Sequence, residues 1–208
     1  MHTRHQHLVK TELRHLRPAQ ITVGYTEVQE KRVMWSGMVK TARKQFLTRH
    51  WFPAVQGPGD YFYIVDHHHL GLALLEEGVA TTFVLLLKDF SQLNQDEFWT
   101  VMDHHQWIHP YDAKGKRLST AALPKTLDGM VDDPFRSLAG DVRHAGGFPK
   151  DQTPFAEFLW ADFFRRRIKS KQLQRNPDAA LQAALVLCHS SEASHLPGWS
   201  GEAAPLIG

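Results

Sequence analysis

Two hydrophobic periodicities alternate along the N-terminal half of the chain. Residues 20–25 (QITVGY) alternate apolar and polar side chains and are rich in β-branched residues, which predicts a strand that Gly24 interrupts. Residues 26–40 place apolar side chains at helical spacing, and Thr26 stands where an N-cap is expected. The first predicted unit is therefore a strand, a turn and a helix.

The clearest pattern of strands and turns follows. Residues 52–55 and 61–65 are apolar and aromatic, and the turn sequence QGPGD between them predicts a pair of strands joined by a tight loop. A helix should begin directly after Asp66 and end at Gly78, the residue suited to a left-handed terminus. The run TTFVLLLKD at 81–89 then predicts a buried strand.

The C-terminal half is predicted to be mainly helical. One helix should start with Ser91 as its N-cap, and two more are expected at 133–145 and 154–171. The predicted fold class is α+β, a domain of strands and helices followed by a helical region. Its parts are a polar lead-in at 1–16, the α+β domain at 17–112, a helical region packed on it at 113–190, and a flexible tail at 191–208.

Composition and charge limit the function classes. Of the 208 residues, 42% are hydrophobic and 22% are charged, and the formal net charge is only +2, so the overall field does not favour a nucleic-acid partner. No apolar run reaches the roughly 18 residues that a membrane-spanning helix needs, and the N-terminus lacks the apolar centre of a secretory signal. A single cysteine, Cys188, fits a reducing compartment. We expect a cytoplasmic protein without a membrane partner.

The segment IVDHHHL, residues 64–70, is the first candidate site. If a helix begins at His67, Asp66 can cap its first turn, and the three histidines surround the free N–H groups at the positive end of the helix dipole. Such a position binds phosphate or carboxylate. Consecutive helical residues point about 100° apart, so at most two of these histidines can reach one small metal ion. The alternative is structural, with one histidine buried, one exposed and one capping.

The second candidate is the pair Glu27 and Lys31, four residues apart near a predicted helix start. Glu27 is suited to act as a general base on a hydroxyl and Lys31 to contact phosphate oxygens. A solvent-facing ion pair, worth only a few tenths of a kcal/mol, explains the same spacing equally well.

Three further groups carry charged or metal-ligating side chains. Residues 104–109 contain a second histidine group, which we interpret as loop or helix-terminus histidines. Arg136 and Ser137 follow an Asp-Pro helix start, where the guanidinium can enter a cleft. The basic run RRRIKSK at 165–171 suits phosphate, but more often such a run is a solvated helix end.

Residues 17–90 resemble the ParB/sulfiredoxin superfamily, and in particular its ParB-like branch. The sequences LRPAQITVGYTEVQEKR and FPAVQGPGDYFYIVDHHHLGLALLEEGV follow that branch's pattern of a strand and helix and then a D-G-H-H-R segment. TPFAEFLWADFFRRRI resembles its C-terminal half. The resemblance implies a small mixed-sheet domain with a nucleotide or phosphate at the start of the D-G-H-H-R helix. Two residues depart from the motif. His67 stands in place of its glycine, and Leu70 stands in place of its arginine. The phosphate-binding role of that arginine would then belong to Arg136 or Lys31.

The resemblance includes DNA-partitioning proteins, sulfiredoxins and free-amino-acid kinases. Sulfiredoxin chemistry needs a cysteine beside the phosphate site, and Cys188 lies far from the motif in the sequence. The aromatic helix PFAEFLWADFF is a poor element for reading DNA bases, which requires exposed polar side chains. An Asp-His-His run also occurs in manganese-dependent DHH phosphoesterases, but the upstream aspartates of that class are absent.

The leading hypothesis is an enzyme, a phosphotransferase or phosphoester hydrolase, that binds a nucleotide or phosphorylated small molecule. In its kinase-like form it uses Mg²⁺ with ATP or ADP and a small-molecule hydroxyl as acceptor. Asp66 holds the metal or the hydroxyl, His68 and His69 contact phosphate together with His67, and Glu27 is the base. The alternatives are a ParB-like DNA-binding protein or nuclease, and a histidine-ligated metal protein.

Overall fold

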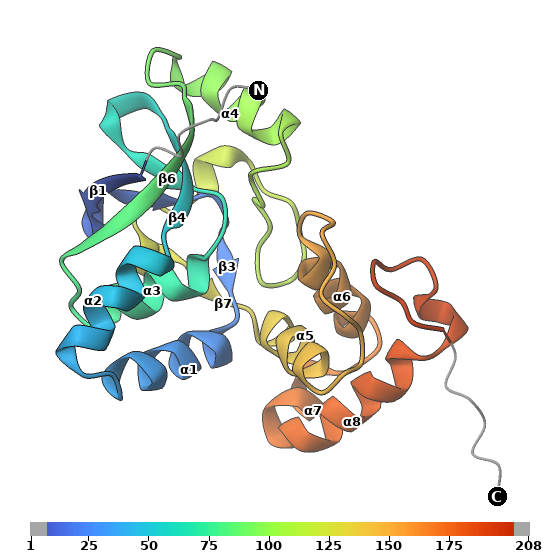
Figure 1. Ribbon diagram of the computed structural model, residues 1–208. Helices are drawn as coiled ribbons and strands as arrows, with labels where there is room; N and C mark the ends of the chain where they lie inside the picture. Colours follow the sequence, from blue (N-terminus) through green and yellow to red (C-terminus); the bar gives the residue numbers. More distant parts are fainter. Residues whose placement is uncertain (1–7, 202–208) are drawn as a thin grey trace, which may run out of the picture. The chain divides into compact units, whose positions relative to one another are not determined.

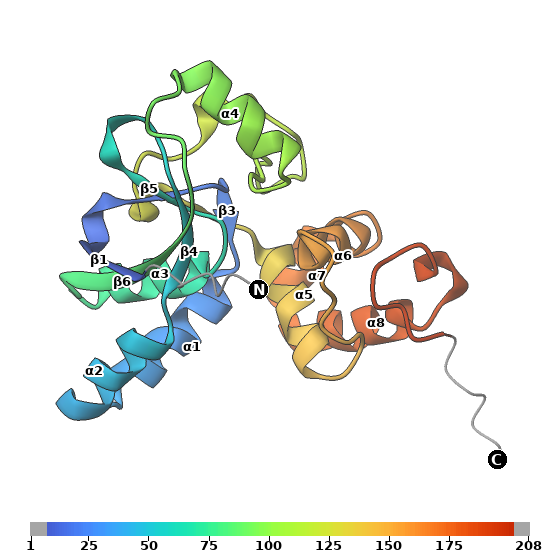
Figure 2. The ribbon, with the colours of Figure 1, turned by 45° about the horizontal axis from the view of Figure 1, so that its top comes forward.

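The computed structural model describes residues 8–201, and the chain folds into two compact units (Figures 1 and 2). Unit 1 comprises the chain up to Val23, Glu27–Asp112 and Lys116–Val131. Unit 2 comprises Gly24–Thr26, Ala113–Gly115 and the chain from Asp132 onward. The boundary predicted after residue 112 lies instead after Val131, because most of the 113–131 segment belongs to unit 1.

Unit 1 is built on a five-stranded mixed sheet. Its spatial order is β1-β6-β4-β5-β2, in which β1/β6 and β4/β5 are antiparallel and β4/β6 and β2/β5 are parallel. The strands are β1 (Leu8–Glu12), β2 (Leu16–Pro18), β4 (Phe52–Gln56), β5 (Phe62–Ile64) and β6 (Thr81–Asp89). A second sheet pairs β3 (Thr22–Val23) with β7 (Val131–Asp132). The predicted α+β class is confirmed.

The hydrophobic pattern explains the central strands. Phe52 of β4 stands in register with Val84 of β6, and both side chains are fully buried. The tight QGPGD turn needs its first glycine, because a Cβ at Gly57 would lie 2.6 Å from Tyr63 and 2.8 Å from Phe98. The sequence therefore places β4, β5 and β6 correctly.

The predicted polar lead-in is wrong for residues 8–16. They form β1, a 3₁₀ turn at Leu13–His15 and the start of β2, and the side chains of Leu13 and Leu16 are almost completely buried. The few apolar residues there suffice because β1 is an edge strand, which needs only one neighbour, β6.

Helix α3 (His68–Glu76) lies against the sheet in unit 1. Seven of its nine residues are buried, and it ends before Gly78, which has φ 69° as predicted. The other helices of this unit are α1 (Tyr25–Ser36), whose first two residues belong to unit 2, α2 (Lys40–Arg49) and α4 (Gln95–His104). The N-cap of α4 is Asn94 and not the predicted Ser91, because Asn94 and Glu97 form a reciprocal capping box.

Unit 2 is helical. Its helices are α5 (Pro134–His144), α6 (Ala156–Arg165), α7 (Ser170–Arg175) and α8 (Pro177–Cys188). The predicted helix at 154–171 thus ends six residues early, and a turn at Arg166–Lys169 separates α6 from α7. Trp160 and Phe164 are fully buried in the core that these helices share.

The prediction of a flexible tail is wrong for residues 191–201, which pack within unit 2. Ala193 and Leu196 are buried in the core of unit 2, and the indole N–H of Trp160 donates to the carbonyl of Pro197 at 2.9 Å. Apolar side chains spaced among small residues were enough to pack this segment. Residues 202–208 of that predicted tail lie outside the described residues.

Candidate functional site

The candidate site begins where β5 leads into α3. Asp66 is exposed, and its Oδ1 accepts a hydrogen bond from the N–H of His67 at 2.6 Å. The helix starts at His68 instead of His67, so Asp66 closes the turn before the helix and does not cap its first turn. The prediction that Asp66 caps the first turn of the helix is therefore wrong.

His67 has a left-handed backbone, with φ 64° and ψ 25°. Glycine adopts this conformation without steric cost, which explains why the resembling motif has glycine here. Histidine is among the residues that tolerate it. Nδ1 of His67 lies 3.0 Å from the carbonyl oxygen of Trp51, and the ring meets Phe52 edge-on at 6.2 Å. These contacts help to hold a non-glycine residue in a glycine conformation.

His68 is a buried structural histidine. Its Nε2 accepts a hydrogen bond from the N–H of Ala19 at 3.1 Å, and the backbone of Ile64 forms a hydrogen bond with the ring. Burial, together with smaller effects of the neighbouring His69 and His67, lowers the pKa of His68 to about 3. A neutral ring that accepts from one backbone group joins α3 to the segment after β2, and it does not face a ligand as a cation.

His69, Glu27 and Lys31 form a cluster, called here the Glu27 cluster. Glu27 Oε2 lies 3.6 Å from Nδ1 of His69, and its Oε1 lies 3.1 Å from Nζ of Lys31. The exposed fractions of the three side chains are 9% for His69, 20% for Glu27 and 30% for Lys31. One carboxylate thus serves both a nearly buried imidazole and a half-buried ammonium group.

An ion-pair network fixes α1 against α3. Arg32 contacts Glu76 at 2.9 Å and Glu77 at 2.9 Å, and Ser36 Oγ donates to Glu77 at 2.9 Å. The hydrogen bond from Arg32 holds the pKa of Glu77 below its ordinary value. Sequence reasoning missed Arg32, although an arginine five residues beyond Glu27 and a Glu-Glu pair at the end of α3 were available signals. The network sets where Glu27 meets His69.

The start of α3 is suited to an anion. His67 makes no side-chain cap, so the positive end of the helix dipole is not neutralised by a capping side chain among the described residues. Lys31 adds a cationic group. Leu70, which stands where the motif has arginine, is 6% exposed in the apolar interior of unit 1. The only predicted replacement for that arginine within unit 1 is therefore Lys31.

Arg136 and Ser137 belong to unit 2, at the start of α5. Asp133 caps this helix by accepting from the N–H of Phe135 at 3.0 Å. Arg136 pairs with Glu157 and is 5% exposed, and Glu157 also pairs with Arg143 at 2.7 Å.

Ser137 Oγ accepts from the N–H of Thr26 at 3.2 Å. The predicted site residues are thus divided, with Glu27, Lys31, Asp66 and His67–His69 in unit 1 and Arg136 and Ser137 in unit 2.

The basic run at 165–171 is largely paired within unit 2. Arg165 bridges Asp133 at 2.5 Å and Asp162 at 2.6 Å. Arg167 contacts Glu192 at 2.8 Å and lies over the ring of Phe163. Two of its arginines therefore act as structural links, which leaves less of the run to meet phosphates.

The second histidine group contains two aromatic stacks, and its His104 and His105 are exposed whereas His109 is half-buried. The ring of His105 stacks on Trp107 at 4.2 Å, and His109 stacks on Tyr111 at 4.5 Å. In residues 8–201 no three histidine, cysteine or acidic side chains gather in a way that could hold a metal ion. The described part of the chain also contains no helix with the length and apolar character to cross a bilayer.

Comparison with known proteins agrees with this architecture. No match was found among curated proteins. The chain is similar to the crystal structure of protein Atu1540 from Agrobacterium tumefaciens, with 46% identity and a TM-score of 0.87 over 95% of this chain and 100% of that chain. The profile of the family described as a putative ParB-like nuclease matches residues 9–166. The chain therefore belongs to the ParB-like family that this description names.

Proposed function

We propose that unit 1 binds a nucleotide or phosphorylated small molecule at the start of α3 and catalyses phosphoryl transfer or phosphoester hydrolysis with the Glu27 cluster. The observation that carries this proposal is the position of Glu27, shared between the nearly buried His69 and Lys31. A second support is the adjacent helix start, which has no side-chain cap.

The chemistry follows from the two contacts of Glu27. A carboxylate beside an imidazole orients the ring and stabilises its protonated form, so His69 can exchange a proton with a phosphate oxygen or an attacking hydroxyl. Lys31 and the dipole of α3 attract the phosphate. In the kinase-like form Glu27 is the base for the acceptor hydroxyl, directly or through His69. His68 acts as a positioning residue through its bond to Ala19.

A Mg²⁺ ion with ATP or ADP remains part of this proposal. Asp66 is an exposed carboxylate at the same helix start, with Oδ1 engaged by the N–H of His67. Mg²⁺ in nucleotide sites is commonly held by one or two carboxylates together with substrate phosphates. Asp66 would be the protein's ligand in that arrangement, and the metal would neutralise charge on the phosphates.

The test is calorimetric titration of the full chain with ATP, ADP and CTP, with and without Mg²⁺, followed by turnover assays with a panel of small hydroxyl acceptors and phosphoesters. Lys31→Ala should weaken binding about 10-fold, because it removes one charge-assisted contact. Glu27→Gln should keep or strengthen binding, since a negative charge is lost, while turnover falls at least 100-fold.

Lys125→Ala, at an exposed position of unit 1, is the matched control and should leave both quantities unchanged. If no nucleotide binds and Glu27→Gln alters no turnover, the proposal is rejected. Thermal melting of each variant separates loss of function from loss of folding.

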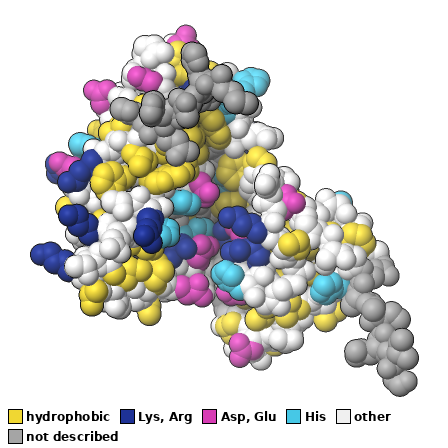
Figure 3. Space-filling view, in the orientation of Figure 1, with side chains coloured by type: hydrophobic (Ala, Val, Ile, Leu, Met, Phe, Trp, Pro, Cys, Tyr) yellow, Lys and Arg dark blue, Asp and Glu magenta, His cyan; other side chains and the backbone are white. Residues whose placement is uncertain are grey.

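A second candidate function is cleavage or binding of nucleic acid, the activity that the family description suggests. Helix α2 carries Lys40, Arg43, Lys44 and Arg49 and no acidic residue. Figure 3 shows Lys and Arg side chains along this side of unit 1. If phosphodiesters bind there, a plot of log affinity against log salt concentration should have a negative slope of several units. Lys44→Ala should reduce the magnitude of that slope by about 1. A flat salt dependence would remove this candidate.

A further inference from the structure

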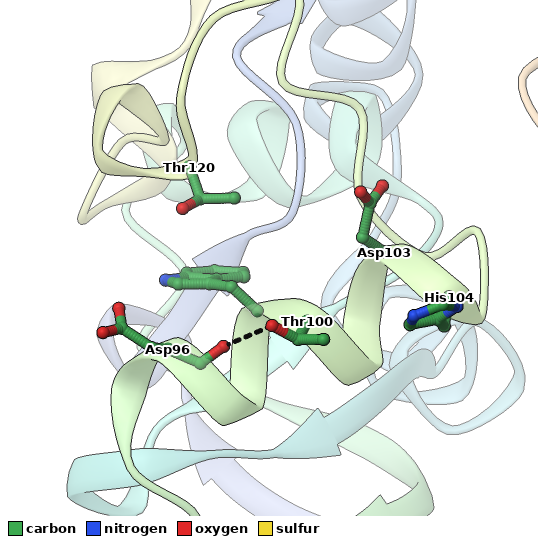
Figure 4. Close-up of a pocket in the computed structure, with 6 residues that line it drawn as sticks. Asp96, Thr100, Asp103, His104 and Thr120 are labelled. Carbon is green, nitrogen blue, oxygen red and sulfur yellow. Dashed lines mark hydrogen bonds between the residues drawn. The ribbon is translucent and has the colours of Figure 1, made fainter.

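An open groove lies along helix α4 in unit 1, away from the Glu27 cluster in the sequence. Its volume is about 430 Å³. Figure 4 shows Thr120, from the 3₁₀ turn Thr120–Ala122, facing α4 from the opposite wall, with Asp96 and Asp103 toward the two ends. The lining residues are Asp96, Trp99, Thr100, Asp103, His104 and Thr120.

The floor of the groove is rigid. The reciprocal capping box of Asn94 and Glu97 fixes the first turn of α4. The indole of Trp99 is half-buried and packs at steep angles on Tyr63, with centroids 5.2 Å apart, and on Phe98, 4.9 Å apart. A ligand would therefore meet a preformed aromatic surface, which lowers the entropic cost of binding.

The polar lining is rich in hydrogen-bond acceptors. Thr100 Oγ1 donates its proton to the carbonyl of Asp96 at 2.8 Å, so only its lone pairs remain for a ligand (Figure 4). No side chain in residues 8–201 pairs with the carboxylate of Asp96. Asp103 is already occupied by the guanidinium of Arg117 at 2.6 Å. One end of the groove thus already binds a guanidinium, and the other end offers a carboxylate.

We propose that this groove binds an organic cation, a primary ammonium or guanidinium group, held by the Asp96 carboxylate and packed on Trp99. The exposed Asp96 carboxylate selects a positively charged ligand with N–H donors, and indole is the aromatic side chain that binds cations best. The same chemistry is offered by a free polyamine and by an arginine or lysine side chain of another protein. This site is independent of the proposed phosphate chemistry.

The test uses the full chain and three cationic probes, which are agmatine, putrescine and the peptide acetyl-Gly-Arg-Gly-amide. Calorimetry should detect saturable binding of at least one of them, with affinity falling as salt rises. Asp96→Asn and Trp99→Leu should each weaken that binding about 10-fold. Glu30→Gln, which removes an exposed acid on α1, is the matched control and should leave it unchanged.

The preferred probe identifies the source of the cation, since agmatine or putrescine indicates a free amine and the peptide indicates a partner side chain. Equal affinity of Asp96→Asn and Glu30→Gln for the probes, or equal binding of neutral 1-butanol, would overturn the proposal. Absence of binding by all three probes would also overturn it. Asp96 lies in the first turn of α4, so melting curves must show that Asp96→Asn still folds.

Discussion

The chain contains two histidine-rich segments of similar composition, Asp66–His69 at the start of α3 and Asp103–His109 at the end of α4, and they have different environments. In the first, His68 and His69 are buried and contact a backbone N–H and a carboxylate. In the second, His104 and His105 are exposed, and His105 stacks on an aromatic ring. Composition alone does not distinguish them.

The difference lies in what surrounds each segment. The first segment leads from a central strand into a helix packed on the sheet, so its side chains enter the interior and must find polar partners there. The second ends a helix and continues as loop, where the exposed imidazoles of His104 and His105 face water, whereas His109 is half-buried. A histidine therefore acquires a specific role here only where burial fixes its partners. Four experiments test this comparison, from the largest expected effect to the smallest.

The largest effect should be on the pH dependence of stability. Because the pKa of His68 is lowered to about 3 in the folded state from about 6.5 in the unfolded state, the unfolded chain binds more protons between these values. The stabilisation is complete above pH 6.5 and is lost as pH falls toward 3, by up to about 5 kcal/mol.

Urea unfolding at pH 7, 5.5 and 4.5 measures this loss. His68→Gln keeps an acceptor for the N–H of Ala19 without titrating, so its stability should fall less over the same range. Equal slopes for the two proteins would contradict the role given to His68.

The second effect is the cost of truncation. His68→Ala should lower the free energy of unfolding by about 2–4 kcal/mol, because it leaves a cavity and a buried N–H without its acceptor. His104→Ala, on the exposed segment, should change it by less than about 0.5 kcal/mol. Chemical denaturation at pH 7 compares the two, and similar losses for both would show that the segments do not differ as described.

A third effect concerns the left-handed residue. His67→Val should destabilise unit 1 by about 2 kcal/mol, since a β-branched residue at φ 64° is strained. His67→Gly should be nearly neutral, because relief of strain offsets the lost contact with Trp51 and the greater freedom of the unfolded chain. Thermal melting of both variants decides this, and a valine variant as stable as the glycine variant would be inconsistent with the backbone geometry.

The smallest effect is expected at the aromatic stack. His105→Ala removes a stacked ring at 4.2 Å from Trp107 and should cost no more than about 1 kcal/mol. His105→Phe, which keeps a flat ring, should recover most of the loss. A cost above 2 kcal/mol in urea unfolding would mean that this segment is as strongly integrated as the first.

Some elements could be predicted from local patterns alone. Strand β6 runs from Thr81 to Asp89 as its apolar run indicated, and α3 ends before Gly78 because only a residue tolerant of positive φ stops a helix there cheaply. Strand β1 could not be predicted, since an edge strand with few apolar residues is stabilised by its neighbour β6. The prediction of Ser91 as the cap of α4 is wrong, and the local signal for Asn94 is Glu97 three residues later, with which it forms the capping box.

The sequence by itself determined the α+β class and the order of the central elements, because these depend on the periodicity of neighbouring residues. It also indicated the family, through the resemblance of residues 17–90 to the motif of the ParB-like branch. Only the tertiary structure decided which histidine is structural and which faces a carboxylate. His68 meets Ala19 across 49 residues of chain, and His69 meets Glu27 across 42. Pairings over such separations are set by how α1, α3 and the sheet pack, and no local pattern encodes them.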